Sequence, residues 1–153
     1  MYVVEEGDLV KGDYPVFCHQ VNCQGAMNSG IAKQIRAKYP EIYNVYHYYC
    51  GKYEDPSAIL GTILSLKTND GRTCVNMFSQ NFYGYDGKQY TDEEAFQQCL
   101  DSIKRCLPDA NTIAFPYKIG CGLGGGNWER IESLLKRFAD ESGKKIIVVR
   151  LKE

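Results

Sequence analysis

Two glycine-rich stretches hold the residue types that suit the binding of an anion. The first reads HQVNCQGAMNSGIA at residues 19–32, and the second reads GCGLGGGNW at residues 120–128. Each follows a short apolar run and leads into a segment of helical period, so each is predicted to join a strand to a helix N-terminus. There, unpaired backbone N–H groups and the positive end of the helix dipole point to one place, and missing side chains let an anion approach. Two such loops on one sheet could hold a diphosphate between them.

Glycines in such loops can also serve the backbone alone. Glycine is common at strand-to-helix turns because it accepts backbone conformations that other residues resist, and this alternative stays open. Gly120, Gly122 and Gly125 spell GxGxxG, but a dinucleotide fold needs more strands downstream, and one predicted strand remains. The sequence has no GK[ST], which a Walker loop requires. The two loops are therefore interpreted as a phosphate site of another kind.

The spacing of the cysteines and histidines gives less support to a catalytic thiol or a zinc site than the glycines give to an anion site. Cys121 lies near a predicted helix N-terminus, where the pKa of a thiol falls. A cysteine phosphatase would need an arginine six positions on, where Asn127 stands, so Cys121 is interpreted as a small packed side chain. The chain has no CxxC pair, and His47 with Cys50 is too sparse a set for zinc. The sequence predicts no metal and no cofactor.

Short apolar and β-branched runs alternate with segments of helical period. The predicted strands are Tyr2–Glu5, Val16–Val21, Ile63–Leu66, Thr73–Phe78, Thr112–Phe115 and Lys145–Leu151. Helices are predicted over residues 42–49, 96–107 and 127–143, with a shorter one from Gly30 to Pro40, and Thr91 with Glu94 predicts a capping box. This alternation indicates an α/β fold with a mixed, largely parallel six-stranded sheet covered by helices on both faces. Ligands of such sheets bind beyond the carboxyl ends of the strands.

Length and composition narrow the class of protein. The 153 residues predict a single domain over 1–153, and a net charge of -1 argues against strong nucleic-acid binding and for a local phosphate site. Seven cysteines, an odd number, favour reduced thiols. With no signal peptide and no membrane-length apolar stretch, the expected place is the cytoplasm of a bacterial cell or a phage-infected host, and the expected state is a monomer.

With both loops in view, the chain resembles the macro domain family over nearly its whole length. The matching pieces are GDLV at residues 7–10, HQVNCQGAMNSGIA at 19–32 and IGCGLGGGNWE at 119–129. The resemblance is to the branch that includes the ADP-ribose 1''-phosphate phosphatases and the terminal ADP-ribose glycohydrolase. It implies a three-layer α/β/α macro domain with an ADP-ribose site.

The resemblance also implies the residues that bind the ligand. Asp8 would accept the adenine amino group with Leu9 beside it, and Asn22 would reach the distal ribose, although Asp8 could equally be a solvated turn residue. The implied ligand-binding residues are Asp8, Leu9, Asn22, Gly25, Ala26, Met27, Asn28, Ser29, Gly30, Ile31, Gly120, Cys121, Gly122, Leu123, Gly124 and Gly125.

Catalytic residues are implied less directly. The glycohydrolase branch uses a lysine after the fourth strand and an aspartate in the second loop, where this chain has Ser79 to Asn81 and Gly124. A lysine-aspartate mechanism would therefore need Lys88, from the segment NFYGYDGKQY. That segment, residues 81–90, could form a lid over the distal ribose or could be an exposed loop without a role.

His19 is the better candidate for catalysis, because phosphatase-like relatives carry a histidine at the matching place. An imidazole there could orient or deprotonate the water that attacks the 1''-phosphate, with Ser79 and Gln80 nearby. A buried structural histidine is the alternative. The expected function is hydrolysis of ADP-ribose 1''-phosphate to ADP-ribose and phosphate. Hydrolysis of ester-linked ADP-ribosyl conjugates of macromolecules, or ADP-ribose recognition without catalysis, are the alternatives.

Overall fold

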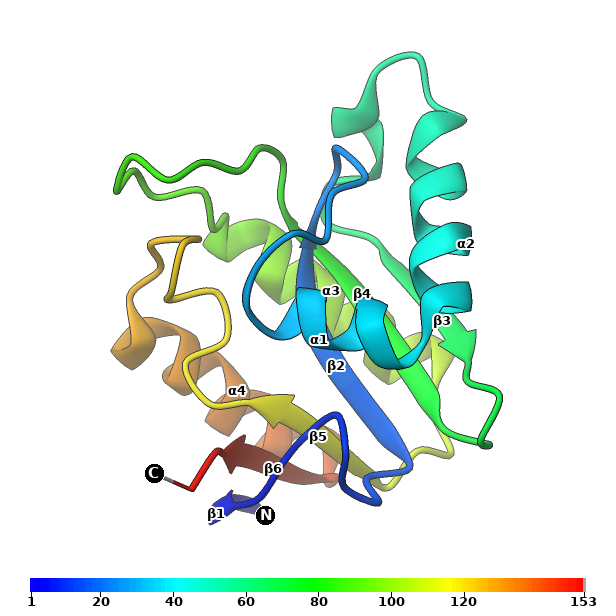
Figure 1. The fold of residues 1–153 in the computed structure, drawn as a ribbon. Coiled ribbons are helices and arrows are strands. Elements are labelled where there is room, and N and C mark those ends of the chain that lie inside the picture. The colour runs from blue at the N-terminus through cyan, green and yellow to red at the C-terminus, as the bar shows by residue number, and fades with distance from the viewer. Residues whose placement is uncertain (153) are drawn as a thin grey trace.

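Residues 1–152 are described by the computed structural model, and they form six strands, four α-helices and one 3-10 helix (Figure 1). In chain order these are β1 Tyr2–Glu6, β2 Val16–Asn22, α1 Gly30–Lys38, α2 Pro40–Gly51, the 3-10 helix Pro56–Ile59, β3 Ile63–Lys67, β4 Thr73–Gln80, α3 Glu93–Cys106, β5 Thr112–Pro116, α4 Trp128–Ser142 and β6 Lys145–Arg150. Every predicted strand is present, with its ends shifted by no more than two residues.

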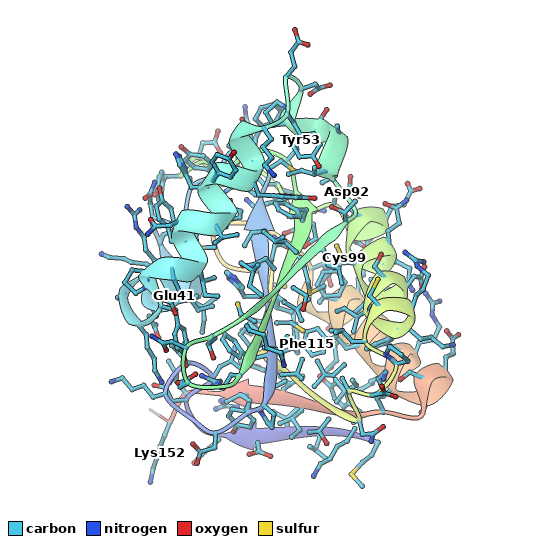
Figure 2. The ribbon with its side chains drawn as sticks, turned by 90° about the vertical axis from the view of Figure 1, so that its right-hand side faces the viewer. Glu41, Tyr53, Asp92, Cys99, Phe115 and Lys152 are labelled. Carbon is cyan, nitrogen blue, oxygen red and sulfur yellow. The ribbon has the colours of Figure 1, made fainter. Side chains whose placement is uncertain are left out.

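The strands form one sheet in the order β1-β6-β5-β2-β4-β3. β3 runs antiparallel to β4, and the other neighbours run parallel, so the predicted mixed, largely parallel sheet is confirmed. α1 and α2 cover one face of the sheet, and α3 and α4 cover the other (Figures 1 and 2). The fold therefore has the expected three layers.

Side chains alternate between these two faces along each strand. In β2, Phe17 packs with α1 and α2, whereas Cys18 packs with α3 and α4. Cys99 of α3 and Phe115 of β5 belong to the second of these layers and are fully buried (Figure 2). Helices thus pack against both faces of the sheet, as predicted.

The sheet opens at its centre. Among the described residues, Phe17 and Ala114 make the single register pair between β2 and β5. β2 pairs with β4 from Val16 to Asn22, and β5 pairs with β6 from Thr112 to Pro116. β2 and β5 therefore diverge toward their carboxyl ends (Figure 1). This fork lies between the two glycine-rich loops.

The start of α3 differs from the predicted capping box of Thr91 and Glu94. Asp92 is the N-cap, and its side chain accepts a hydrogen bond from the Ala95 N–H at 2.9 Å. Thr91 lies one residue before the cap, and its N–H donates to the Gly124 carbonyl at 2.9 Å. Asp92 thus provides the local cap, and Thr91 instead contacts the second glycine-rich loop.

Two further expectations concern the state of the cysteines and the presence of membrane-spanning segments. All seven cysteines are free thiols, and five of them are buried. None of the helices formed by residues 1–152 combines the length and the apolar composition that crossing a membrane requires.

Candidate functional site

A cleft of about 690 Å³ lies along the carboxyl edge of β6, β5, β2 and β4. The two glycine-rich loops form its walls, and the segment after β4 closes one end. Many of the residues predicted from the sequence to bind the ligand or to take part in catalysis line this wall. They are Asn22, Ala26, Asn28, Ser29, Gly30, Ile31, Gln80, Gly120, Gly122, Leu123 and Gly124.

The first loop is held in shape by Asn22. Its Oδ1 accepts hydrogen bonds from the N–H groups of Gln24 at 3.0 Å and Ala26 at 3.3 Å and from the Tyr46 hydroxyl at 3.0 Å. Its Nδ2 donates to the Ala26 carbonyl at 2.9 Å. The amide is therefore engaged within the loop, which it folds back toward β2.

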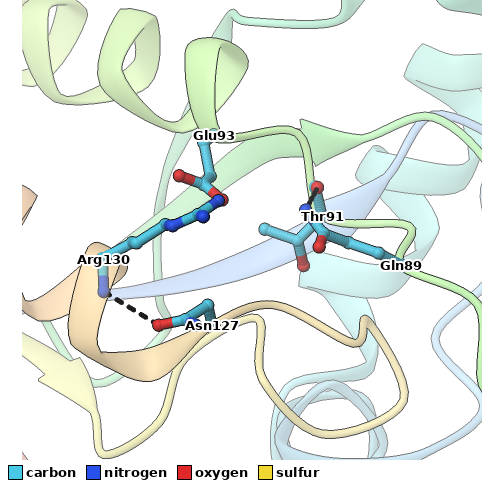
Figure 3. Close-up of polar contacts among 5 residues, drawn as sticks. All are labelled: Gln89, Thr91, Glu93, Asn127 and Arg130. Carbon is cyan, nitrogen blue, oxygen red and sulfur yellow. Dashed lines mark hydrogen bonds and ion pairs between the residues drawn. The ribbon is translucent and has the colours of Figure 1, made fainter.

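The N-terminus of α1 is the helix start best suited to an anion. Ser29 is its N-cap but makes no side-chain capping bond, and the first turn holds no acidic residue. Unpaired N–H groups at such an end attract negative charge. In contrast, Asn127 caps α4 by accepting from the Arg130 N–H at 3.2 Å, and Arg130 also contacts Glu93 of α3 at 3.4 Å (Figure 3).

In the second loop, two glycines are required by close packing, and a third is open to the cleft. A Cβ on Gly125 would lie 2.6 Å from the Lys88 carbonyl oxygen, and one on Gly126 would lie 2.7 Å from the Gly120 carbonyl oxygen. These two positions need glycine for packing rather than for a ligand. Gly122 lines the cleft, and a Cβ there would meet no atom within 4 Å. Its surface is free for a ligand.

A chain of side-chain hydrogen bonds joins the floor of the cleft to this loop. Ser79 Oγ donates to Gln20 Oε1 at 2.7 Å, and Gln20 Nε2 donates to Gln80 Oε1 at 2.7 Å and to Thr91 Oγ1 at 2.9 Å. Thr91 Oγ1 then donates to the Gly120 carbonyl at 2.6 Å. Ser79 is thus buried beneath the floor, whereas Gln80 reaches the wall.

His19, the expected catalytic residue, is not among the residues that line the cleft wall. It is fully buried, and its Nε2 lies 2.6 Å from Asn76 Oδ1. Burial lowers the pKa of His19 to about 4, against the smaller raising effect of the Asn76 hydrogen bond. The alternation along β2 gives His19 the face of Phe17 and turns Gln20 to the other face. This position does not suit a base that contacts a ligand.

Several implied ligand residues also lie outside the wall, namely Asp8, Leu9, Gly25, Met27, Cys121 and Gly125. Asp8 Oδ1 accepts from the Val10 and Lys11 N–H groups at 3.0 and 2.9 Å, as a turn residue does. Burial raises the pKa of the Cys121 thiol, which does not favour a nucleophile. Lys88 is outside the wall as well, 3.7 Å from Asp86.

Several wall residues were not expected from the sequence: Gln20, Gln34, Tyr83, Tyr85, Tyr117, Lys118, Arg150 and Lys152. Tyr83 and Tyr85 belong to the segment 81–90, which borders the cleft. The signal for Gln20 was a polar residue within an apolar strand, and nothing in the sequence marked Arg150. Among residues 1–152, no group of three or more His, Cys, Asp or Glu side chains is arranged to hold a metal ion.

Proteins of known structure share this fold. The macrodomain of Mycobacterium tuberculosis DarG superposes with a TM-score of 0.83 at 22% identity, covering 100% of this chain and 99% of that chain. That likeness establishes the fold.

Named relatives are similar in sequence. An ADP-ribose 1''-phosphate phosphatase of Debaryomyces hansenii is 28% identical over 147 residues, covering 80% of this chain and 82% of the relative. A DNA ADP-ribosyl glycohydrolase of Mycobacterium bovis is 27% identical over 138 residues, covering 88% of this chain and 38% of the relative. Residues 18–135 match the macro domain family, and this span contains both loops of the cleft. The chain therefore belongs to the macro domain family.

Proposed function

We propose that the cleft binds ADP-ribose, with the diphosphate between the N-terminus of α1 and the loop Gly120–Gly124. The observation that carries this proposal is the composition of the wall. It joins an uncapped helix start to two glycine-rich loops, and its charged side chains, within residues 1–152, are all basic. A dianionic diphosphate suits this combination of N–H donors and positive charge.

The ligand takes one direction in the cleft. The Gly7 N–H donates to the Arg150 carbonyl at 2.9 Å, so the neighbouring Asp8 lies beside the β6 end. Oδ1 of Asp8 serves the turn, and in this proposal its other carboxylate oxygen accepts the adenine amino group from just outside the cleft wall. The adenosine then lies at the end of the cleft beside β6, here called the β6 end. The distal ribose lies at the opposite end beside β4, near Asn22 and Tyr83.

We also propose that the reaction is hydrolysis of ADP-ribose 1''-phosphate. Water attacks the phosphorus, the bond from phosphorus to the ribose oxygen breaks, and ADP-ribose and inorganic phosphate leave. Phosphoryl transfer depends mainly on positioning and on stabilising negative charge, which the loop N–H groups supply. Gln80 and the buried Ser79 act by positioning Gln20 and the second loop. Relatives named as phosphatases over most of the chain support this choice.

Recognition without catalysis is the second candidate. Among the described residues, the wall contains no carboxylate, imidazole or thiol that could act as a base or nucleophile. Hydrolysis of ADP-ribosyl conjugates is the third candidate, and a relative named as a DNA ADP-ribosyl glycohydrolase supports it.

Binding is tested with a matched pair of variants at Gly122. A Cβ there would meet no atom within 4 Å, so the backbone leaves room for a side chain to begin at this position. Asp and Asn have nearly the same size, but only Asp brings negative charge to the diphosphate. Calorimetry should show ADP-ribose bound at least about tenfold more weakly by Gly122→Asp than by Gly122→Asn. Equal affinities, or no binding to the wild-type chain, would overturn the proposed site.

Catalysis is tested by phosphorus NMR of ADP-ribose 1''-phosphate. Release of inorganic phosphate, slowed by Gln80→Ala, supports the phosphatase. Shifted diphosphate signals without turnover support recognition alone, and ester-linked conjugates are then the next substrates to assay.

A further inference from the structure

Three basic residues gather at the β6 end of the cleft. Lys118, Arg150 and Lys152 line its wall, although the chain as a whole has a net charge of -1. Within residues 1–152, none of them forms an ion pair. Glu6 is the register partner of Arg150 on β1, but no ion pair joins them. No carboxylate of residues 1–152 therefore lies within salt-bridge distance of these three cations.

Two of these cations converge on one aromatic ring. Arg150 Cζ lies 5.4 Å and Lys118 Nζ lies 5.6 Å from the centroid of Tyr117. Lys118 has a φ of 58°, the single positive φ outside glycine among the described residues. This backbone is uncommon for a lysine, and it belongs to the turn that the Ile119 N–H closes by donating to the Pro116 carbonyl at 3.1 Å.

The position of this cluster separates it from the diphosphate. The cleft edge runs through β6, β5, β2 and β4 in that order, and β2 and β5 diverge there. The N-terminus of α1 follows β2, so the diphosphate lies about one or two strands from Arg150. Under the orientation of the proposed function, the cluster faces the adenosine ribose rather than the distal ribose.

We propose that the Lys118 and Arg150 end binds a further phosphate monoester carried by the adenosine ribose. The preferred ligand class is then ADP-ribose phosphorylated on that ribose. A guanidinium pairs with phosphate through two parallel hydrogen bonds, and an arginine accommodates the 2'-phosphate in other nucleotide sites, where an acidic residue would bind the free hydroxyl. The described wall has the arginine and no acidic residue. This inference rests on the proposed binding of ADP-ribose.

Calorimetry with ADP-ribose and ADP-ribose 2'-phosphate tests the proposal. At low salt the wild-type chain should bind the phosphorylated form about tenfold more tightly, and added salt should reduce that ratio. Arg150→Gln together with Lys118→Gln should bring the ratio close to one. Arg105→Gln is the matched control, because Arg105 is exposed on α3 outside the cleft wall and should leave the ratio unchanged. Adenosine 2',5'-bisphosphate and 3',5'-bisphosphate, compared with AMP, tell which hydroxyl carries the phosphate.

The outcomes separate this proposal from the function on which it rests. Binding of ADP-ribose with no preference for the phosphorylated form overturns the inference and leaves the proposed function standing. A preference that survives the double substitution also overturns it. If neither nucleotide binds, both proposals fail.

Discussion

His19 shows how one buried side chain can make stability depend on pH. Its pKa is about 4 in the folded chain, because burial disfavours the charged ring, against an ordinary value of 6.5. At a pH between these two values, His19 binds a proton in the unfolded chain but not in the folded chain. Stability is therefore full above pH 6.5 and is lost as the pH falls, by about 1.4 kcal/mol per unit and about 3 kcal/mol in all.

Urea unfolding of the wild-type chain and of His19→Gln checks this expectation. Glutamine can reach Asn76 with its amide and does not titrate. Between pH 7 and pH 4.5 the wild-type chain should lose about 2 to 3 kcal/mol more than the variant does. His47 and the carboxylates are common to both proteins and drop out of the difference. Parallel pH profiles would contradict the burial of a neutral imidazole.

The sequence predicted the two loops but not the role of each residue within them. The loops themselves were predicted from their glycines. Gly125 is held by packing against Lys88, however, and Gly122 faces the cleft. Because both are glycines in one short run, only the contacts made by distant segments distinguish them. The pattern also could not show that His19 is fully buried against Asn76 and does not line the cleft.

At the scale of elements, α2 supports the first loop from behind. The Tyr46 hydroxyl donates to the Asn22 carbonyl at 2.6 Å and to Asn22 Oδ1 at 3.0 Å. Tyr46→Phe keeps the ring but removes one donor from each of these two acceptors, while Asn22 Oδ1 keeps the N–H groups of Gln24 and Ala26. We expect a loss of about 2 kcal/mol in the free energy of unfolding and weaker ADP-ribose binding. Tyr48→Phe on the exposed side of α2 is the control. Equal behaviour of the two variants in urea unfolding and calorimetry would argue against this support.

The entry to α3 supports the second loop in the same way. Thr91→Val keeps the shape of the side chain but removes the hydroxyl that accepts from Gln20 and donates to Gly120. The variant should lose about 1 to 2 kcal/mol of stability and bind ADP-ribose more weakly. Thr112→Val at the start of β5 lies outside the cleft and serves as control. Unchanged calorimetric affinity in Thr91→Val would show that the loop keeps its form without this bond.

Elements were predicted better than their connections. β-branched apolar runs predicted the six strands, and Gly143 marks the end of α4 as expected, whereas α2 begins at Pro40, two residues before its predicted start. The predicted capping box at Thr91 was wrong, because Asp92 caps α3 and the Thr91 N–H donates to the Gly124 carbonyl. Local pattern cannot report such a contact, since its partner lies far along the chain.

At the scale of the whole molecule, the strand order creates the site. β2 and β5 are neighbours that share one register pair among the described residues, so they diverge into the fork where the cleft lies. Alternating strands and helices indicated a ligand beyond the carboxyl ends of the strands. The sequence could not place β6 beside β5, and it therefore missed the basic residues at that end.

A ligand that bridges the fork should stabilise the chain more than its halves do. ADP-ribose contacts both sides at once under the proposed function, so binding of its second half is effectively intramolecular. At a ligand concentration about 100 times its Kd, binding adds about 2.7 kcal/mol, or roughly 5 to 10 °C in Tm for a domain of this size. AMP and ribose 5-phosphate, alone or together at the same concentration, should raise Tm less, as thermal unfolding can measure. If AMP alone matches ADP-ribose, the ligand occupies only the adenosine end, and the β4 side of the fork takes no part in binding.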